Sequence, residues 1–266
     1  MNNINKTWQA GPLYIVSQLV FKDLLLFFRG FLDKVIDLSI MLGLNVIVFG
    51  YFMPGVRPDF GVFILIGAIA SFGFFEIVGK VGQLVADIDG DRTINYKLIL
   101  PLSSTLVFCS QAIAWALEST IINIILFPLG KILLFSQFDL TKIAYVKLCL
   151  MIMATNLFYG FFALWVTSML RGGIRSLSHL WIRFISPLYM FGCYFYSWQT
   201  AYNLSPAIGY ISFLNPFVFI MEGTRSAVLG AESFLPFWYS FAALIGFIVF
   251  FGWHGIKRLK VKLDCI

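Results

Sequence analysis

The charged side chains that interrupt long apolar runs are the residues of this sequence that could do chemistry. Glu76 and Glu118 each lie inside such a run. An ionisable group at depth in a membrane is costly, so it faces a bundle interior or a cavity by default and indicates a pathway or an ion pair. Phe72 lies one helical turn before Glu76 and Phe75 flanks it, which places rings beside a carboxylate. The candidate lining residues of a substrate pathway are Phe72, Phe75, Glu76, Tyr189 and Tyr194.

A structural interpretation of the same residues stays open. The chain has 30 phenylalanines, so any cluster of them is weak evidence for a pathway, and Glu76 could lie close to the headgroups. Tyr189 and Tyr194 fall in the stretch LYMFGCYFYSW, which could equally form an aromatic belt at the outer membrane interface.

A short helix is predicted in the stretch FLNPFVFIMEGTRSAVLG, residues 213–230. Pro216 lacks an N–H and pre-sets its backbone dihedral, and Asn215 can cap the free N–H groups of the next turn. The helix is expected from Phe217 to Val228, with Gly230 as its C-cap. Glu222 and Arg225 are spaced i, i+3 and are expected to pair on one face, which would allow the helix to lie partly buried at the outer interface.

No catalytic, cofactor-binding or metal-binding residue is predicted. His179 and His254 are far apart and match no HExxH spacing. The stretch GFFEIVGK, residues 73–80, departs from a P-loop because its glycines are one residue too far apart and Val81 stands where Ser or Thr would hold magnesium. The chain is therefore not expected to hydrolyse ATP by itself.

The composition indicates an all-α membrane protein. Of 266 residues, 60% are hydrophobic and 12% are charged, and the mean hydropathy is +0.88. The apolar runs are continuous rather than alternating, which favours spanning helices over a barrel. The net charge of +6 is spread over short loops, so membrane topology explains it better than a nucleic-acid partner. Six spans are expected, at about 35–54, 60–79, 104–129, 145–169, 180–199 and 236–255.

The chain is expected to form a single membrane domain, residues 1–266, with both termini in the cytoplasm. Most of its 19 Lys and Arg residues fall in segments that lie inside under that orientation. Within residues 1–34, an amphipathic segment at 13–33 suits an interfacial helix, although a poor first span stays possible. The outer segment 200–235 is too apolar for a solvated loop and is expected to re-enter the membrane.

The predicted cytoplasmic loop at 80–103 is the longest connection on the inner side, and a soluble partner is expected to bind and act there. It carries Gly90 as a turn and Pro101 before the next span. A solvated linker is the alternative interpretation. Its candidate coupling residues are Asp87, Asp89, Arg92 and Lys97.

The sequence resembles the ABC-2-type permeases, the membrane subunits of ATP-binding-cassette exporters. These proteins commonly carry Asn-Pro, then Glu and Arg, then Leu-Gly before the last span. The matching residues here are Asn215, Pro216, Glu222, Arg225, Leu229 and Gly230. The N-terminal amphipathic helix, six spans, the inside loop ending in LPLSS and the re-entrant segment extend the resemblance over nearly the whole chain.

The resemblance implies an exporter in the bacterial inner membrane, built from two permease copies, taken here as a homodimer, and two cytoplasmic ATP-binding-cassette ATPases. ATP and magnesium would bind in the ATPase and not in this chain, and loop 80–103 would dock on it. The implied cargo is an amphiphile, a lipid or a lipid-linked saccharide. The expected pathway is rich in Phe rather than Tyr and Trp, which favours an amphiphilic or lipidic cargo over a saccharide.

Two other functions stay open on the sequence. A proton-coupled secondary transporter would use Glu76 or Glu118 as its relay and need no ATPase. A structural membrane subunit of a larger assembly would use the same spans without a cargo.

Overall fold

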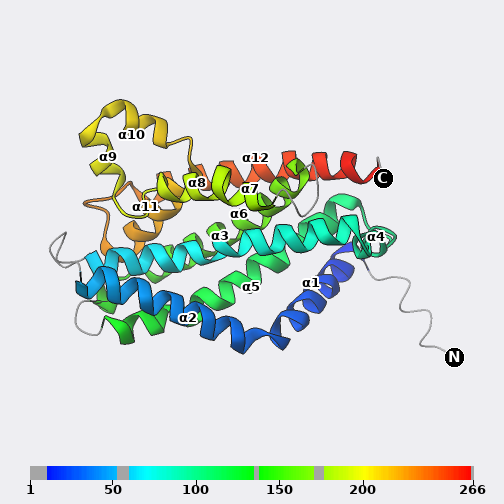
Figure 1. Ribbon diagram of the computed structural model, residues 1–266, viewed down its shortest axis with the longest axis horizontal. Helices are drawn as coiled ribbons and strands as arrows, with labels where there is room; N and C mark the ends of the chain where they lie inside the picture. The colour runs from blue at the N-terminus through cyan, green and yellow to red at the C-terminus, as the bar shows by residue number, and fades with distance from the viewer. Residues whose placement is uncertain (1–10, 53–59, 135–137, 171–176, 265–266) are drawn as a thin grey trace.

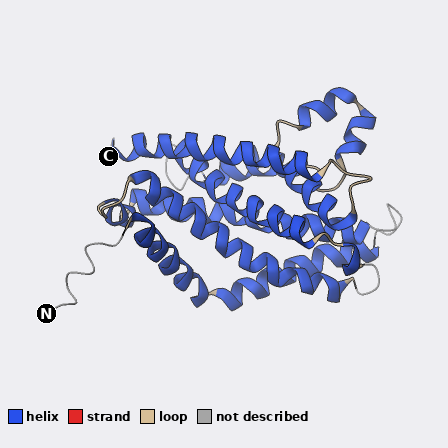
Figure 2. Ribbon diagram, turned by 180° about the vertical axis from the view of Figure 1, so that it is seen from behind, coloured by secondary structure: helices blue, strands red, loops and turns tan. Residues whose placement is uncertain are grey.

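The computed structural model describes residues 11–52, 60–134, 138–170 and 177–264, and this part of the chain is helical with short connections (Figures 1 and 2). In chain order its longer helices are α1 (Pro12–Arg29), α2 (Phe31–Ile47), α3 (Phe60–Asp89), α5 (Ser104–Leu133), α6 (Tyr145–Met169), α11 (Pro216–Leu229) and α12 (Phe237–Asp264). The short helices are α4 (Thr93–Leu98), α7 (Leu177–Leu180), α8 (Ser186–Met190), α9 (Trp198–Leu204) and α10 (Pro206–Ser212). Single turns are η2 (Val48–Phe52) and η5 (Trp181–Ile185), both π-helical, and η3 (Leu140–Lys142), a 3₁₀ turn.

Five of the described helices are long and apolar enough to cross a membrane, so the chain is an all-α, multi-pass membrane protein. They are α2 with η2, α3, α5, α6 and α12. Helix α3 is the central one, because 83% of its most apolar window is buried, against 17% for α2. Helix α2 therefore lies at the edge of the bundle, where its apolar side chains face outward.

The long helices pack closely through small residues. A Cβ added to Gly255 of α12 would lie 2.9 Å from the Cα of Trp165 on α6, and one added to Gly160 of α6 would collide with the carbonyl of Ala112 on α5. In a membrane the helices gain from van der Waals packing rather than from excluding water, so such close approaches matter for association. Helix α6 is thereby fixed between α5 and α12.

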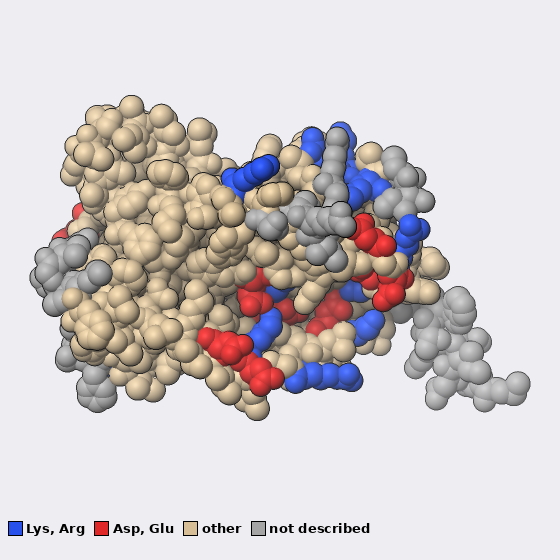
Figure 3. Space-filling view, in the orientation of Figure 1, with Lys and Arg blue, Asp and Glu red and all other residues tan. Residues whose placement is uncertain are grey.

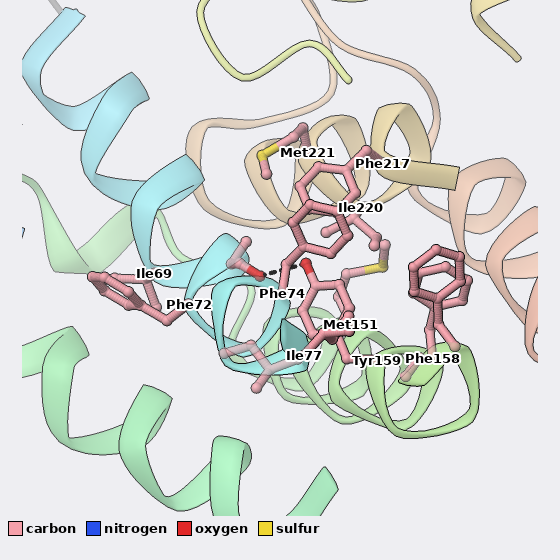
Figure 4. Close-up of a cluster of buried hydrophobic side chains, with 14 of the residues drawn as sticks. Ile69, Phe72, Phe74, Ile77, Met151, Phe158, Tyr159, Phe217, Ile220 and Met221 are labelled. Atoms are coloured by element: carbon pink, nitrogen blue, oxygen red, sulfur yellow. Dashed lines mark hydrogen bonds between the residues drawn. The ribbon is translucent and has the colours of Figure 1, made fainter. Parts of the chain in front are cut away.

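The core lies where α3, α6 and α11 meet (Figure 4). The rings of Phe74 and Phe217 are 4.2 Å apart between centroids, and Tyr159 packs against both. The hydroxyl of Tyr159 donates a 2.8 Å hydrogen bond to the carbonyl of Ala70 on α3. Figure 4 shows Phe72 and Ile69 on the opposite side of α3 from Phe74. Helix α3 is thus packed on both sides.

Several helices extend beyond the predicted spans. Helix α3 continues to Asp89, so the first ten residues of the expected loop 80–103 are helical. Helix α12 continues to Asp264, and α5 to Leu133. A helix can continue past its apolar run when its polar side chains pair with neighbouring helices. The hydrophobic runs in the sequence do not show that pairing. Residues 53–54 of the first expected span lie outside the described residues.

The N-terminal segment folds as the separate helix α1, which ends at Arg29 rather than continuing to residue 33. Gly30 separates it from α2, and Figure 1 shows the two helices meeting at an angle. Helix α1 packs against α5. Residues 1–10 of the expected segment 1–34 lie outside the described residues.

The predicted continuous span at 180–199 is wrong. Helical structure runs from Leu177 through η5 and ends at Met190, and turns follow until α9 begins at Trp198. Cys193 within these turns has φ of +63°, which is the left-handed region and ends a helix. The run was long enough by composition, but its backbone bends because tertiary contacts bind the carbonyls of residues 193 and 194, as described below.

The capped helix predicted after Asn215-Pro216 is confirmed. Helix α11 begins at Pro216, and the Asn215 side chain accepts a 3.0 Å hydrogen bond from the N–H of Phe217. Gly230 follows the helix with φ of +94°, a conformation that favours glycine. Segment 200–235 as a whole consists of α9, α10, α11 and short connections.

Candidate functional site

Glu222 on α11 is fully buried and is held by backbone groups from two other segments. Its two carboxylate oxygens accept hydrogen bonds of 2.8 Å from the N–H of Trp198 and 3.0 Å from the N–H of Leu235. The carboxylate therefore joins the start of α9 and the segment before α12 to α11.

Arg225, one turn further along α11, is also fully buried. Its guanidinium donates to the carbonyls of Phe63 (3.3 Å), Tyr194 (2.6 Å) and Cys193, and it lies 3.4 Å from the centroid of the Phe63 ring. A Cβ at Gly67 would come within 2.8 Å of this guanidinium, so α3 leaves room for it at that position. Arg225 thus joins α11 to α3 and to the turns after α8.

We name Glu222, Arg225 and the backbone groups they bind the α11 anchor. The sequence predicts that the two charges pair with each other on one helix face. The structure instead shows both binding backbone groups of neighbouring segments: Glu222 binds the N–H groups of Trp198 and Leu235, and Arg225 binds carbonyls of α3 and of the turns after α8. Buried backbone groups outside a helix need hydrogen-bond partners, and the α11 anchor supplies them for these turns.

The predicted pathway residues separate into different environments. Phe75, Tyr189 and Tyr194 do come together, because the ring of Tyr189 lies 5.0 Å from that of Phe75 and 4.4 Å from that of Tyr194. Phe72 is 2% exposed and belongs to the core. Glu76 faces α2, where its carboxylate pairs with Lys34 at 2.6 Å.

A second ion pair lies close to Glu76. Lys80 is buried and pairs with Glu118 on α5 at 3.1 Å, and it also donates a 3.2 Å hydrogen bond to the carbonyl of Trp115. The carboxylates at positions 76 and 118 each therefore have a lysine partner on a neighbouring helix. The sequence singles out the carboxylates but not these partners.

Charged side chains gather at one end of the molecule, which we name the charged end: α1, α4 and the last turns of α12. Figure 3 shows blue and red atoms concentrated there, while the part over α9 and α10 is tan, because these two helices carry no Lys, Arg, Asp or Glu. Lys262 on α12 donates to the carbonyls of Thr167 (3.2 Å) and Leu170 (3.1 Å). A cation is favourable at a helix C-terminus, so this contact ties the end of α12 to the end of α6.

Two of the four predicted coupling residues support α4 from inside. The carboxylate of Asp87 accepts hydrogen bonds from the N–H groups of Thr93 and Ile94, both at 2.8 Å, and so caps α4. Lys97 pairs with Asp23 on α1 at 2.9 Å and donates to Gln111 on α5 at 2.7 Å. Asp23 and Lys97 are 74 residues apart in the sequence, and only the fold brings them together.

The other two coupling residues, Asp89 and Arg92, are exposed. Arg92 has φ of +54° and forms the tight turn between α3 and α4. Beside them Tyr96 is 73% exposed and Ile99 is 79% exposed. An exposed aromatic and an exposed aliphatic side chain among charges at the polar end of a membrane protein are typical of a protein contact. Tyr96 and Ile99 are not among the residues predicted from the sequence, although a large apolar side chain in a polar loop is a signal that could have indicated them.

A cavity of about 280 Å³ lies beneath α4, and its lining includes Asp87, Lys97, Gln83 and Trp115. The charged side chains that line this cavity, those of Asp87 and Lys97, are the same ones that hold α4 in place. Among the described residues, no group of three or more His, Cys, Asp or Glu side chains could hold a metal ion.

Comparison of the whole sequence with models of known protein families and with characterised proteins found no match. The site is therefore interpreted from its geometry alone.

Proposed function

We propose that this chain is the membrane subunit of an ATP-driven exporter of an amphiphilic, lipidic or lipid-linked saccharide cargo. A separate cytoplasmic ATP-binding-cassette ATPase binds ATP and magnesium. Two copies of each subunit make up the exporter, which lies in the bacterial inner membrane with both termini in the cytoplasm. This proposal rests on the resemblance to the ABC-2-type permeases and on one structural observation.

That observation is the exposed surface of α4. Tyr96, Ile99, Asp89 and Arg92 form an apolar and charged surface at the end that carries most of the basic residues. Basic residues favour the cytoplasmic side, so a soluble cytoplasmic protein is the partner that can reach this surface. An interface core of this kind, aromatic with a charged rim, suits protein binding.

The connections of α4 would transmit a push from that partner into the bundle. Asp87 holds α4 to the end of α3, and Lys97 holds it to α1 and α5. A movement of α4 would therefore move the end of α3. Because α3 is the central helix, this would change the packing of α3 against α2 and α11. ATP binding can shift the two transport states only if the ATPase contacts differ between them, and an α4 that moves with α3 provides such a contact.

The segment from Leu177 to Leu229 would complete the membrane domain. The helical stretch from α7 to α8 is the candidate for the sixth crossing, with the turns at residues 191–197 at its outer part. Helices α9, α10 and α11 would form the re-entrant segment, and the α11 anchor satisfies its backbone groups. The cluster of Phe75, Tyr189 and Tyr194 would lie beside the cargo pathway.

The ion pairs favour the exporter over a proton-coupled carrier. Glu76 pairs with Lys34 and Glu118 with Lys80. In both pairs the carboxylate already has a partner that joins two helices, which suits a structural role rather than a relay along a pathway.

The decisive experiment is to purify the tagged chain gently from its native membrane and to identify its partners by mass spectrometry. A P-loop protein at near-equal amount supports the proposal. The double variant Tyr96→Ser with Ile99→Ser should lose most of that partner. The matched control, Ile132→Ser with Val146→Ser, removes similarly exposed apolar groups at the opposite end and should keep it. An intact complex without any P-loop protein would contradict the proposal.

A further inference from the structure

A groove between α8 and α10 has one charged residue at its edge. The groove encloses about 420 Å³, and its walls include Phe184, Leu188, Ile208 and Ile211, with Arg183 among them. Arg183 and Phe184 belong to η5, and the two isoleucines belong to α10. The groove is thus an apolar surface bordered by a single guanidinium.

The groove has three other polar side chains: those of Asn215 and Ser212 are bound within the fold, and the third is the phenol of Tyr196. Asn215 donates to the carbonyl of Leu188 at 2.8 Å and accepts from Phe217, and Ser212 donates to the carbonyl of Gly209 at 2.7 Å. In the described part of the chain, no hydrogen bond or ion pair engages the guanidinium of Arg183, which is exposed. The groove therefore offers one available cation.

Arg183 lies beside the end of α6 that faces the charged end. The ring of the adjacent Phe184 lies 5.7 Å from that of Trp165, and Trp165 donates a 2.8 Å hydrogen bond to His254 of α12. Ile208 and Ile211 of α10 line the same groove as Arg183. The guanidinium and the apolar walls therefore belong to one continuous surface.

We propose that this groove binds one anionic phospholipid of the surrounding membrane, with the phosphate on Arg183 and an acyl chain along Ile208 and Ile211. Charge complementarity carries the assignment. The exposed guanidinium of Arg183 has no counter-charge among the described residues and is free to take an anion, and a planar guanidinium binds a phosphate through two parallel hydrogen bonds. The apolar walls match the chain of the same molecule. Lipid binding goes beyond the export function because it requires no ATPase.

The test is lipid retention by the purified chain alone. The protein is reconstituted in vesicles of equal parts phosphatidylcholine and phosphatidylglycerol, extracted in mild detergent, and analysed by native mass spectrometry. The unmodified chain should retain phosphatidylglycerol in preference to phosphatidylcholine. Arg183→Gln should reduce that retention about tenfold, the loss expected for one charge-assisted contact, and Arg183→Lys should restore part of it.

Two variants test the apolar part of the groove. Ile211→Gln places an amide on the acyl-chain wall and should lower retention, whereas Ile182→Gln is the matched control because Ile182 is 72% exposed and precedes Arg183 but does not line the groove. All of these side chains are exposed, so the thermal unfolding midpoint should stay unchanged and serve as the check on folding.

Three results would overturn the proposal: equal retention by Arg183→Gln and the unmodified chain, no preference for phosphatidylglycerol, or a change of oligomeric state in Ile211→Gln without lipid loss. The last result would assign the groove to a second copy of the chain. Because the ATPase is absent, none of these results depends on whether export is the function.

Discussion

The charged end and the α11 anchor use charged side chains in opposite ways. At the charged end and in the adjoining part of the bundle, lysines face carboxylates from other helices, as in the pairs Lys97–Asp23 and Lys34–Glu76. In the α11 anchor, Glu222 and Arg225 are 0% exposed and bind backbone N–H and carbonyl groups of the turns around α11.

The difference teaches which region holds its shape and which can move. An ion pair that is partly exposed can separate at small cost, because water or headgroups replace the lost partner. A buried charge that satisfies non-helical backbone cannot leave without exposing unpaired groups to an apolar interior. We therefore expect the α11 anchor to stay fixed while the charged end transmits movement.

The largest effect is expected at Arg225. Arg225→Met should lower the free energy of unfolding by about 3–5 kcal/mol, because three carbonyls lose their donor and each unsatisfied buried group costs about 1–3 kcal/mol. Reversible denaturation in mixed micelles measures this change. Lys257→Met on the exposed face of α12 is the control and should lie within about 0.5 kcal/mol of the unmodified chain. Equal stability of both variants would remove the distinction between the two regions.

Glu222→Leu should follow, with a loss of about 2–3 kcal/mol, because two backbone N–H groups lose their acceptor. Hydrogen exchange should accelerate at the amides of Trp198 and Leu235 in particular. Glu222→Gln keeps one acceptor oxygen, so it should keep one of these two amides protected from exchange. Its stability should lie between that of the unmodified chain and that of Glu222→Leu. Unchanged exchange at both amides in Glu222→Leu would show that the carboxylate does not hold these segments.

A smaller and non-additive effect is expected at the pair Lys80–Glu118. Lys80→Met alone should destabilise by about 1–3 kcal/mol because it leaves Glu118 without its counter-charge, at a site that is only partly dry. Adding Glu118→Leu should recover much of that loss. A double variant no more stable than Lys80→Met would contradict the interpretation that the two side chains act as a pair.

The smallest effect on stability and the sharpest effect on coupling are expected at Lys97. Lys97→Ala removes one partly exposed ion pair and should cost about 1 kcal/mol or less. It should nevertheless reduce transport-linked ATP hydrolysis in the complex, because α4 loses its connection to α1. Asp23→Lys with Lys97→Asp restores an ion pair and should recover coupling. Coupling that stays lost in this swap would place Lys97 in direct contact with the partner.

The sequence by itself determined the local structure. The apolar runs indicate a multi-pass, all-α membrane protein, and Asn215-Pro216 with Gly230 predicts both ends of α11, because capping depends on a few adjacent residues. It also singled out Glu222 and Arg225 as unusual, since charges in an apolar helix are costly wherever they lie.

Only the tertiary structure decided what those charges bind. The expected pairing of Glu222 with Arg225 follows from helical spacing, but bends in neighbouring segments bring backbone groups to both side chains, which bind them. The same holds for Asp23 with Lys97 and for the helix that ends at Met190 inside a long apolar run. Hydropathy measures whether a residue can lie in a membrane, whereas its partner is set by contacts between segments that are distant in the sequence.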